Sequence, residues 1–202
     1  MKKRIEILQF NDWEIQVWIP DQADLQLTYQ KQESESAFPF WAKLWPAAFT
    51  LTAFLQDHPN WIINKKVLEL AAGLGLPSLY ASHFASSVHC SDYNTLAVTF
   101  IKENIALNKI TNVTCSKIDW TQLPDELEWE VLLMSDVNYN PSDFEVLLQM
   151  LHHFIAMGKT ILLSTPQRLA GKDFITSLLP YCKVNEERWH DEIAINVLVL
   201  KK

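Results

Sequence analysis

Two glycines in one short turn are the residues that most directly suggest chemistry in this sequence. The chain has only four glycines among its 202 residues, and Gly73 and Gly75 both lie in the segment VLELAAGLGLPSL. They follow a run of β-formers and precede a helix-forming segment, so the turn can bring its backbone close to a carboxylate or a nucleotide at the helix start. We expect a ligand at this turn, and a tight turn without a ligand is the alternative.

The residues around the turn separate two classes of ligand. A dinucleotide fingerprint, GxGxxG or GxGxxA, would need glycine or alanine where Ser78 stands. The pattern acid-x-G-x-G-x-G fits better, since it is met by Glu69, Gly73 and Gly75, with Ala71 in place of its first glycine. We therefore expect these four residues to bind a nucleoside-containing cofactor, and we expect Ala71 to keep ordinary backbone angles.

Three aspartates follow the turn at the predicted ends of successive strands, where open α/β sheets bind their ligands. Asp92 comes 17 residues after Gly75, where a carboxylate can accept hydrogen bonds from both hydroxyls of a ribose; a helix N-cap is its alternative role. Asp119 is placed to accept from an adenine amino group while Trp120 covers the base, although packing alone is an equal alternative. Asp136 is expected beside the glycine turn and is the best candidate for acting on a substrate.

The elements that must position these residues alternate from Lys65 onward. Short apolar runs are followed by amphipathic segments, which is typical of a parallel α/β sheet. Five parallel strands are expected at KVLELA, SVHCSDY, VTCSKIDW, EVLLMSD and KTILLSTP, with helices at 76–85, 95–109, 141–157 and 171–180. CKVNEERW and EIAINVLVLKK, joined by a polar turn, predict a terminal antiparallel hairpin. The fold class is therefore α/β, with a doubly wound, seven-stranded, Rossmann-like sheet.

The first third of the chain has a different pattern. IEILQF and EIQVWIP flank an Asn11-Asp12 turn signal and predict an N-terminal β-hairpin. Residues 24–38 are polar and predict a surface loop or flap, and apolar residues at helical spacing predict a helix from Pro46 to Gln56. We expect one domain over residues 1–202, in which 1–60 cover the substrate and cofactor and 61–202 form the cofactor-binding core.

Composition excludes several other classes of protein. The formal net charge is −7 and the basic residues are scattered, so we expect no nucleic-acid partner. The N-terminus breaks its apolar run with polar residues and no stretch approaches the roughly 18 apolar residues of a spanning helix, so we expect a cytoplasmic monomer without a signal peptide or membrane contact. The three separated cysteines and the His152-His153 pair show no metal-ligand spacing, so we expect no metal.

Taken together, these segments resemble a known family. From Phe40 to the C-terminus the chain is similar to the seven-strand protein-lysine methyltransferases, including those related to the electron-transfer-flavoprotein β-subunit lysine methyltransferase. The similar segments are FWAKLWPAAFTLTAFL, VLELAAGLGLPSL, IDW and DVNY, in that order. Five parallel strands with a terminal hairpin are also the arrangement of these enzymes. The chain departs from their pattern at Ala71 and at Asn140-Pro141, directly after the DVNY segment.

The resemblance implies an activity and a set of roles. It implies S-adenosylmethionine as cofactor, S-adenosylhomocysteine as product, and N-methylation of an accessible lysine on a protein substrate. It also implies that Trp45 lies near the cofactor, that Asp92 holds ribose, that Asp119 and Trp120 flank adenine, and that Asp136 and Tyr139 form the acceptor site.

Methyl transfer from a sulfonium is an in-line displacement, so alignment and exclusion of water are the main tasks of the protein. We expect Asp136 to orient the acceptor amine and stabilise the cationic product, and the Tyr139 hydroxyl to shape the slot. Trp45 either faces positive charge or fills the core. Alternatives are a small-molecule N-methyltransferase with a closed pocket, a cofactor-binding module without catalysis, and, less favoured, an NAD-dependent oxidoreductase.

Overall fold

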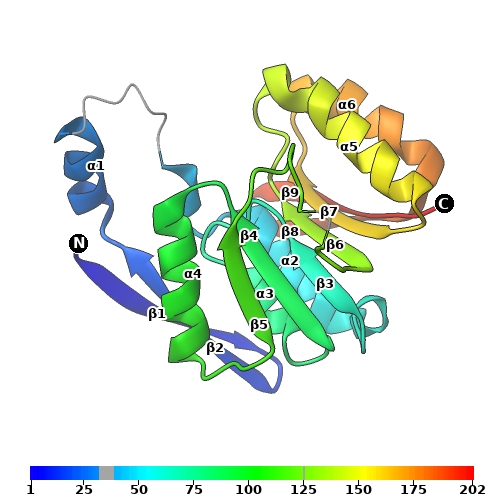
Figure 1. Ribbon diagram of the computed structural model, residues 1–202. Coiled ribbons are helices and arrows are strands. Elements are labelled where there is room, and N and C mark those ends of the chain that lie inside the picture. Colours follow the sequence, from blue (N-terminus) through cyan, green and yellow to red (C-terminus); the bar gives the residue numbers. More distant parts are fainter. Residues whose placement is uncertain (32–38, 125) are drawn as a thin grey trace.

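A seven-stranded mixed sheet forms the centre of the computed structural model, which describes residues 1–31, 39–124 and 126–202 (Figure 1). Five strands are parallel, and β9 lies antiparallel between β7 and β8. The strand order is β5 (Val113–Lys117), β4 (Ser87–Asp92), β3 (Lys66–Glu69), β6 (Val131–Ser135), β7 (Thr160–Pro166), β9 (Ile193–Leu200) and β8 (Cys182–His190). The predicted doubly wound sheet with a terminal hairpin is confirmed.

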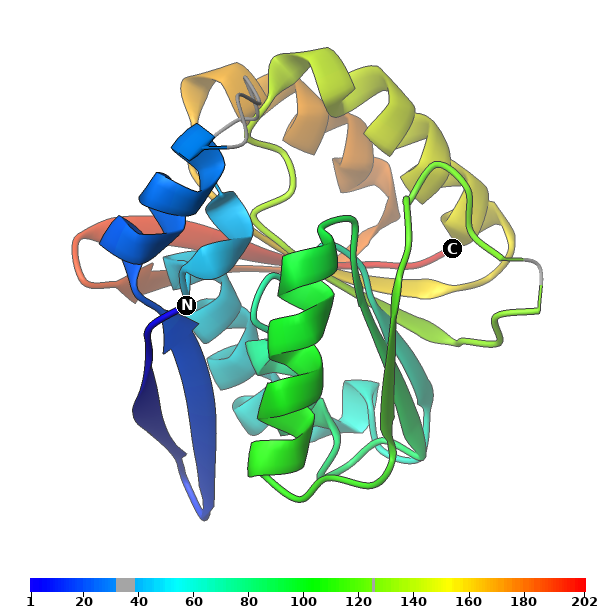
Figure 2. The same cartoon turned by 60° about the vertical axis from the view of Figure 1, so that its left-hand side comes forward.

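Helices cover both faces of this sheet (Figures 1 and 2). One face carries α2 (Pro46–Asp57), α3 (Leu76–Ala81) and α4 (Thr95–Leu107), and the other carries α5 (Phe144–Ala156) and α6 (Lys172–Leu178). Neighbouring residues of β3 divide between the two cores, because successive strand side chains point to opposite faces: Val67 belongs to the first and Leu68 to the second. The predicted helix from Pro46 is confirmed to within one residue of its end.

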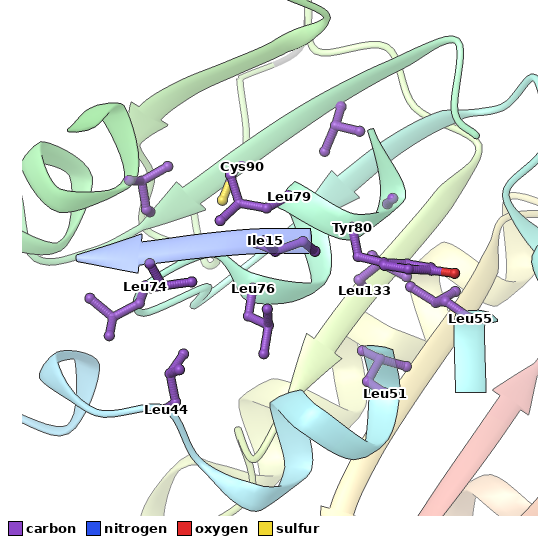
Figure 3. Close-up of a cluster of buried hydrophobic side chains, with 14 of the residues drawn as sticks. Ile15, Leu44, Leu51, Leu55, Leu74, Leu76, Leu79, Tyr80, Cys90 and Leu133 are labelled. Atoms are coloured by element: carbon purple, nitrogen blue, oxygen red, sulfur yellow. The ribbon is translucent and has the colours of Figure 1, made fainter. Parts of the chain in front are cut away.

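The first core holds α3 against the sheet. Figure 3 shows Leu76, Leu79 and Tyr80 of this short helix among side chains from α2 and β6, and Tyr80 is only 1% exposed. Burying a side chain of this size stabilises the fold by about 1.5–3 kcal/mol. A helix of six residues is held by such packing rather than by its own propensity, and the packing thereby fixes the glycine turn that precedes it.

The predicted N-terminal hairpin is confirmed as β1 (Lys3–Phe10) and β2 (Trp13–Pro20), which form a separate two-stranded sheet. Two asparagine side chains, one within α4 and one at its C-cap, hydrogen-bond to the edge of β2 that does not pair with β1. Asn108 accepts the Gln16 N–H at 2.9 Å and donates to the Gln16 carbonyl at 2.7 Å. Asn104, which is fully buried, accepts the Trp18 N–H at 2.7 Å.

The loop predicted over residues 24–38 is wrong for its first part. Residues Gln22–Lys31 form helix α1, and residues 32–38 lie outside the described residues. The Asp21 carboxylate caps the helix by accepting the Asp24 N–H at 2.9 Å. Leu25 is fully buried and Tyr29 packs against the first core, so these contacts help to hold a helix whose composition is mostly polar.

Short 3₁₀ segments connect the main elements: η1 (Phe40–Ala42), η2 (Pro59–Trp61), η3 (Pro141–Asp143), η4 (Leu169–Gly171) and η5 (Leu179–Tyr181). Within the described ranges, no helix combines the length and the apolar character needed to cross a membrane.

Candidate active site

A cavity of about 710 Å³ opens at the carboxyl ends of the central strands. It lies where the strand order reverses, with β4 on one side of β3 and β6 on the other, the usual ligand position in an open α/β sheet. Its volume falls within the roughly 300–1,000 Å³ of small-molecule sites. The predicted site residues that line it are Trp45, Ala71, Gly73, Asp92, Asp119, Trp120, Asp136 and Tyr139; Glu69 and Gly75 are not lining residues.

The glycine turn differs from our expectation at Ala71. Its φ is +53°, and Gly73 and Gly75 follow at +58° and +79°, so the prediction that Ala71 keeps ordinary backbone angles is wrong. The turn is anchored by the Ala72 N–H, which donates to the Ser91 carbonyl of β4 at 2.9 Å. This anchor holds an alanine in the left-handed region, which costs about 1–2 kcal/mol for a residue with a Cβ.

Each glycine is also required by the protein itself. A Cβ at Gly73 would lie 3.1 Å from the backbone carbonyl of Trp41, and one at Gly75 would lie 3.3 Å from Cys90 Sγ. Gly73 therefore lets the segment before α2 close over the turn, while Gly75 faces the core. Of the two, only Gly73 presents its backbone to the cavity.

Glu69 lies beneath the turn, 1% exposed. Its carboxyl accepts the Ser78 N–H at 2.9 Å and the Ser78 hydroxyl at 2.5 Å. Burial raises the pKa of Glu69 to about 8, although the Ser78 donors oppose the shift. The Ser78 N–H is therefore satisfied from within the protein, and our expectation that this helix start is open to a ligand fails at that group.

Asp92 joins the turn after β3 to the turn after β4. One carboxylate oxygen accepts the Gly73 N–H at 2.9 Å and the other accepts the Asn94 N–H at 2.8 Å. Burial raises the pKa of Asp92, and these backbone donors lower it. Asn94, rather than Asp92, caps α4 by accepting the Leu96 N–H. Each Asp92 oxygen retains a further lone pair for a ligand hydroxyl.

The next acid, Asp119, follows β5 on the same edge of the sheet. One of its oxygens accepts both the N–H and the hydroxyl of Thr121, at 2.9 and 2.7 Å, and these bonds lower the pKa of Asp119. The carboxylate is therefore ionised at neutral pH and fixed by its own loop. Trp120 packs partly against the second core and completes this wall of the cavity.

At the opposite wall, Asp136 has a partner that sequence reasoning missed. Arg168 donates two parallel hydrogen bonds to it, Nη1 to Oδ1 at 2.5 Å and Nη2 to Oδ2 at 3.0 Å. Asp136 itself has φ +54°, and its N–H donates to the Ser164 carbonyl at 2.9 Å. The side chain of Asp136 is 9% exposed and that of Arg168 is 34% exposed. The two residues are 32 positions apart, so no local motif points to the pair.

Aromatic rings form the mouth beside this ion pair. The Phe40 ring lies 5.0 Å from that of Tyr139 and 6.0 Å from that of Trp45, measured between centroids. The Trp45 indole donates to the Phe40 carbonyl at 2.7 Å, and the Lys43 ammonium lies 4.9 Å from the Trp45 ring. Burial and nearby carboxylates, Asp143 first, raise the pKa of Tyr139. Its hydroxyl is thus neutral at physiological pH.

Helix α1 contributes a further lining residue, Tyr29, which was not predicted because its segment was expected to be a loop. Its hydroxyl accepts from the Trp41 indole at 3.2 Å and from the Asn94 side-chain amide at 3.0 Å. Of the described residues in the segment 1–60, only Tyr29 and later ones line the cavity. The hairpin β1–β2 instead packs on α4 and α3.

A family model described as lysine methyltransferase matches residues 20–180 of the chain. The chain belongs to this family. The predicted family, the protein N-methyltransferase class and S-adenosylmethionine as the family's cofactor are confirmed.

Several curated relatives resemble parts of the chain. It is 29% identical to protein N-lysine methyltransferase METTL21A of Danio rerio over 77% of this chain and 75% of the relative. It is 28% identical to the electron transfer flavoprotein beta subunit lysine methyltransferase of Danio rerio, over 67% of this chain and 53% of the relative. It is 32% identical to histone-arginine methyltransferase METTL23 of Xenopus laevis, over 52% of this chain. The chain spans about half the length of the latter two relatives, 53% and 47%.

Solved structures support the fold. The T. thermophilus 16S rRNA methyltransferase in complex with S-adenosylmethionine and guanosine superposes with a TM-score of 0.68 at 15% identity, covering 99% of this chain and 50% of that one.

The cavity fits the cofactor of this family. Asp92 offers acceptor oxygens that burial has desolvated, the Gly73 backbone lies against them, and Trp120 provides an aromatic wall beside the carboxylate of Asp119. Hydroxyl donors from a ribose would satisfy the acceptors of Asp92. Over residues 1–31, 39–124 and 126–202, no group of three His, Cys, Asp or Glu side chains is arranged to hold a metal.

Proposed function

We propose that this protein transfers a methyl group from S-adenosylmethionine to the side-chain nitrogen of a lysine in a protein substrate. The observation that carries the proposal is one continuous cavity that joins the Gly73–Asp92 cradle at one end to Asp136 and Tyr139 at the other. Family membership supports the chemistry, and the METTL21A relative supports lysine as the acceptor.

In this proposal some of the predicted residues contact the cofactor, and the others keep the glycine turn in its conformation. Asp92 holds the ribose hydroxyls, Asp119 and Trp120 flank adenine, and Trp45 lies near the cofactor. Glu69 supports the turn from the core, and Ala71 and Gly75 give the turn its left-handed backbone angles. When bound, the cofactor supplies an electrophilic methyl group on a positively charged sulfur.

The acceptor end aligns the nitrogen and removes water from it. Asp136 orients the amine by accepting a hydrogen bond from it, while the neutral Tyr139 hydroxyl donates or accepts a hydrogen bond beside the acceptor nitrogen. No residue forms a covalent bond to the substrate.

Exposed apolar residues beside the mouth favour a protein over a free amine as substrate. Leu169 directly follows Arg168 and is 96% exposed. Aromatic side chains are enriched at protein interfaces, and Phe40 and Tyr139 at the mouth are 39% and 49% exposed. The net charge of −7 favours a basic partner.

Profiling with labelled S-adenosylmethionine tests the proposal. The purified protein is added to a cell extract, and modified residues are identified by mass spectrometry after protease digestion. We expect label in lysine side chains of one or a few proteins, and inhibition by S-adenosylhomocysteine. Label confined to low-mass amines, or to arginine, would contradict the lysine assignment. Calorimetry with S-adenosylhomocysteine and NAD separately tests the cofactor.

A further inference from the structure

The ion pair of Asp136 with Arg168 raises a question about the protonation state of the acceptor. A lysine ammonium has an ordinary pKa near 10.4, yet only the neutral amine has a lone pair with which to attack a methyl group. An isolated carboxylate beside the amine would favour the ammonium form and so oppose the reaction. Asp136 is 9% exposed, so solvent would screen its charge only weakly.

Arg168 cancels that charge. Both carboxylate oxygens of Asp136 accept from one guanidinium, a fork geometry that lysine cannot reproduce. The pair has no net charge, and each Asp136 oxygen keeps a lone pair that can accept a hydrogen bond from a substrate donor. It can orient a neutral amine by hydrogen bonding without strongly favouring its protonated form.

We propose that Arg168 is a positioning residue that neutralises Asp136, so that the acceptor nitrogen is held and reacts as a neutral amine. This inference rests on the proposed function. The ammonium loses its proton to solvent, the nitrogen lone pair forms the new C–N bond, and the electrons of the broken C–S bond remain on sulfur.

The other charged groups that line the cavity have partners of their own. The described ones are Lys43 over the Trp45 ring, Asp92 on backbone amides, Asp119 on Thr121, and Asp143 on Asn140 and Ser142. The titratable hydroxyls there are those of Tyr29, Tyr93 and Tyr139. Among these described groups, Arg168 is the one that forms an ion pair with Asp136.

A second contact, besides the Asp136–Arg168 pair, joins the loop after β6 to the end of β7. Asn138, which is 2% exposed, accepts the Thr165 hydroxyl at 2.6 Å. A Cβ on Gly171 would come within 3.2 Å of the Asn138 amide. The loop after β6 is therefore fixed to the end of β7 independently of Arg168. Removing the guanidinium should change charge at Asp136 more than it changes the path of the chain.

The test is the pH dependence of the single-turnover rate, measured on a lysine substrate found by the labelled-cofactor experiment. This rate reports the protonation of groups in the bound complex. In Arg168→Gln the unbalanced carboxylate raises the pKa of the bound amine, so the midpoint of the rising limb should move up by about one pH unit. The charge-matched control is Arg4→Gln, because Arg4 is exposed on β1; its midpoint should equal that of the wild type.

Two more variants separate charge from structure. Arg168→Lys keeps the charge and loses the fork, so its rate should fall while its midpoint stays in place. The double variant Asp136→Asn with Arg168→Gln removes both charges, so its midpoint should return to the wild-type value even though the reaction is slow. A purely structural role of Arg168 would lower the rate in every variant and leave every midpoint unmoved.

The outcomes distinguish this inference from the function on which it rests. An unshifted midpoint in Arg168→Gln, or a shift that persists in the double variant, would overturn the role of Arg168 while lysine methylation by the wild type stands. Wild-type protein that labels no lysine at any pH would overturn the proposed function itself. Thermal unfolding and calorimetry with S-adenosylhomocysteine confirm that each variant is folded, and Arg168→Met replaces Arg168→Gln if the latter fails this check.

Discussion

The loops after β3 and β4, here called the cofactor side, hold their acid with backbone amides, whereas the loops after β6 and β7, the acceptor side, hold theirs with another side chain. Asp92 accepts from the N–H groups of Gly73 and Asn94. Asp136 accepts from the guanidinium of Arg168. The same residue type therefore has its environment set by local chain geometry on one side and by a distant residue on the other.

This difference matters for how the site can vary. Backbone donors persist through most substitutions, so the cofactor side tolerates changes such as Ala71 in place of glycine while it still presents the same groups. A carboxylate held by one side chain changes its charge balance with a single mutation. The acceptor side is thus where specificity can change with least disturbance to the fold.

The largest effect is expected from Asp136→Ala, which breaks the acceptor side alone. Turnover should fall by about 100-fold or more, because the group that orients the amine is lost. Affinity for S-adenosylhomocysteine should change by less than about threefold. Steady-state kinetics and calorimetry measure the two quantities.

Asp136→Asn is the isosteric control for that experiment and should lose turnover to a similar degree. Full activity in either variant would remove Asp136 from the acceptor site. A parallel loss of cofactor affinity would show that the two sides are not separable.

The next effect concerns Glu69→Gln on the cofactor side. The folded pKa of Glu69 is about 8, against an ordinary 4.5. Between these pH values the folded protein holds a proton that the unfolded chain has released, so this group makes the wild type less stable as pH rises. The variant lacks this loss, and from pH 5 to pH 8 its free energy of unfolding should improve relative to the wild type by roughly 3–4 kcal/mol.

Urea unfolding at several pH values measures the Glu69 effect. Glu126→Gln, at an exposed position, should leave the pH slope as in the wild type. An unchanged slope in Glu69→Gln would mean that the acid is ionised beneath the turn.

Gly73→Ala should disturb the cofactor side by a smaller amount. The new Cβ would combine a φ of +58° with a 3.1 Å approach to the Trp41 carbonyl, and we expect about 2 kcal/mol of destabilisation and roughly tenfold weaker S-adenosylhomocysteine binding. Gly158→Ala is the matched control, since Gly158 has φ +79° and nothing within 4 Å of a Cβ. It should lose stability through backbone strain alone and keep its affinity.

The smallest effect is expected for Ala71→Gly. Glycine relieves the left-handed strain but loses more chain entropy on folding, so the net gain should be about 0.5–1 kcal/mol, or a few degrees in the melting temperature. Lys109→Gly, at φ +54° after α4, should gain a comparable amount. A loss of stability at Ala71 would indicate that its methyl group packs favourably in the turn.

Most of the fold could be predicted because each strand and helix carries its own periodicity. The terminal hairpin, the helix from Pro46 and the acids after β4 and β6 all followed from local pattern. The place of the cavity, at the carboxyl ends of the strands, followed from a general rule of α/β folds rather than from particular residues.

The features that were missed depend on contacts distant in sequence. Arg168 reaches Asp136 from another strand, and the left-handed angles of Ala71 follow from its neighbour's bond to Ser91. Helix α1 has too few apolar residues for its periodicity to stand out, and Tyr29 was lost with it. Glu69 was taken as a ligand contact because sequence shows the acid and not the Ser78 donors that enclose it.

The amide of Asn104 links the N-terminal hairpin to the glycine turn, two parts of the chain that also share the first core. Its oxygen accepts from Trp18 in the N-terminal hairpin, and its nitrogen donates at 3.0 Å to the carbonyl of Leu74 in the glycine turn. The hairpin therefore supports the position of the glycine turn. Trimming this enzyme to a minimal catalytic unit would remove the Trp18 N–H that fixes the Asn104 amide and the hairpin side chains that cover the first core, so the first twenty residues belong in such a unit.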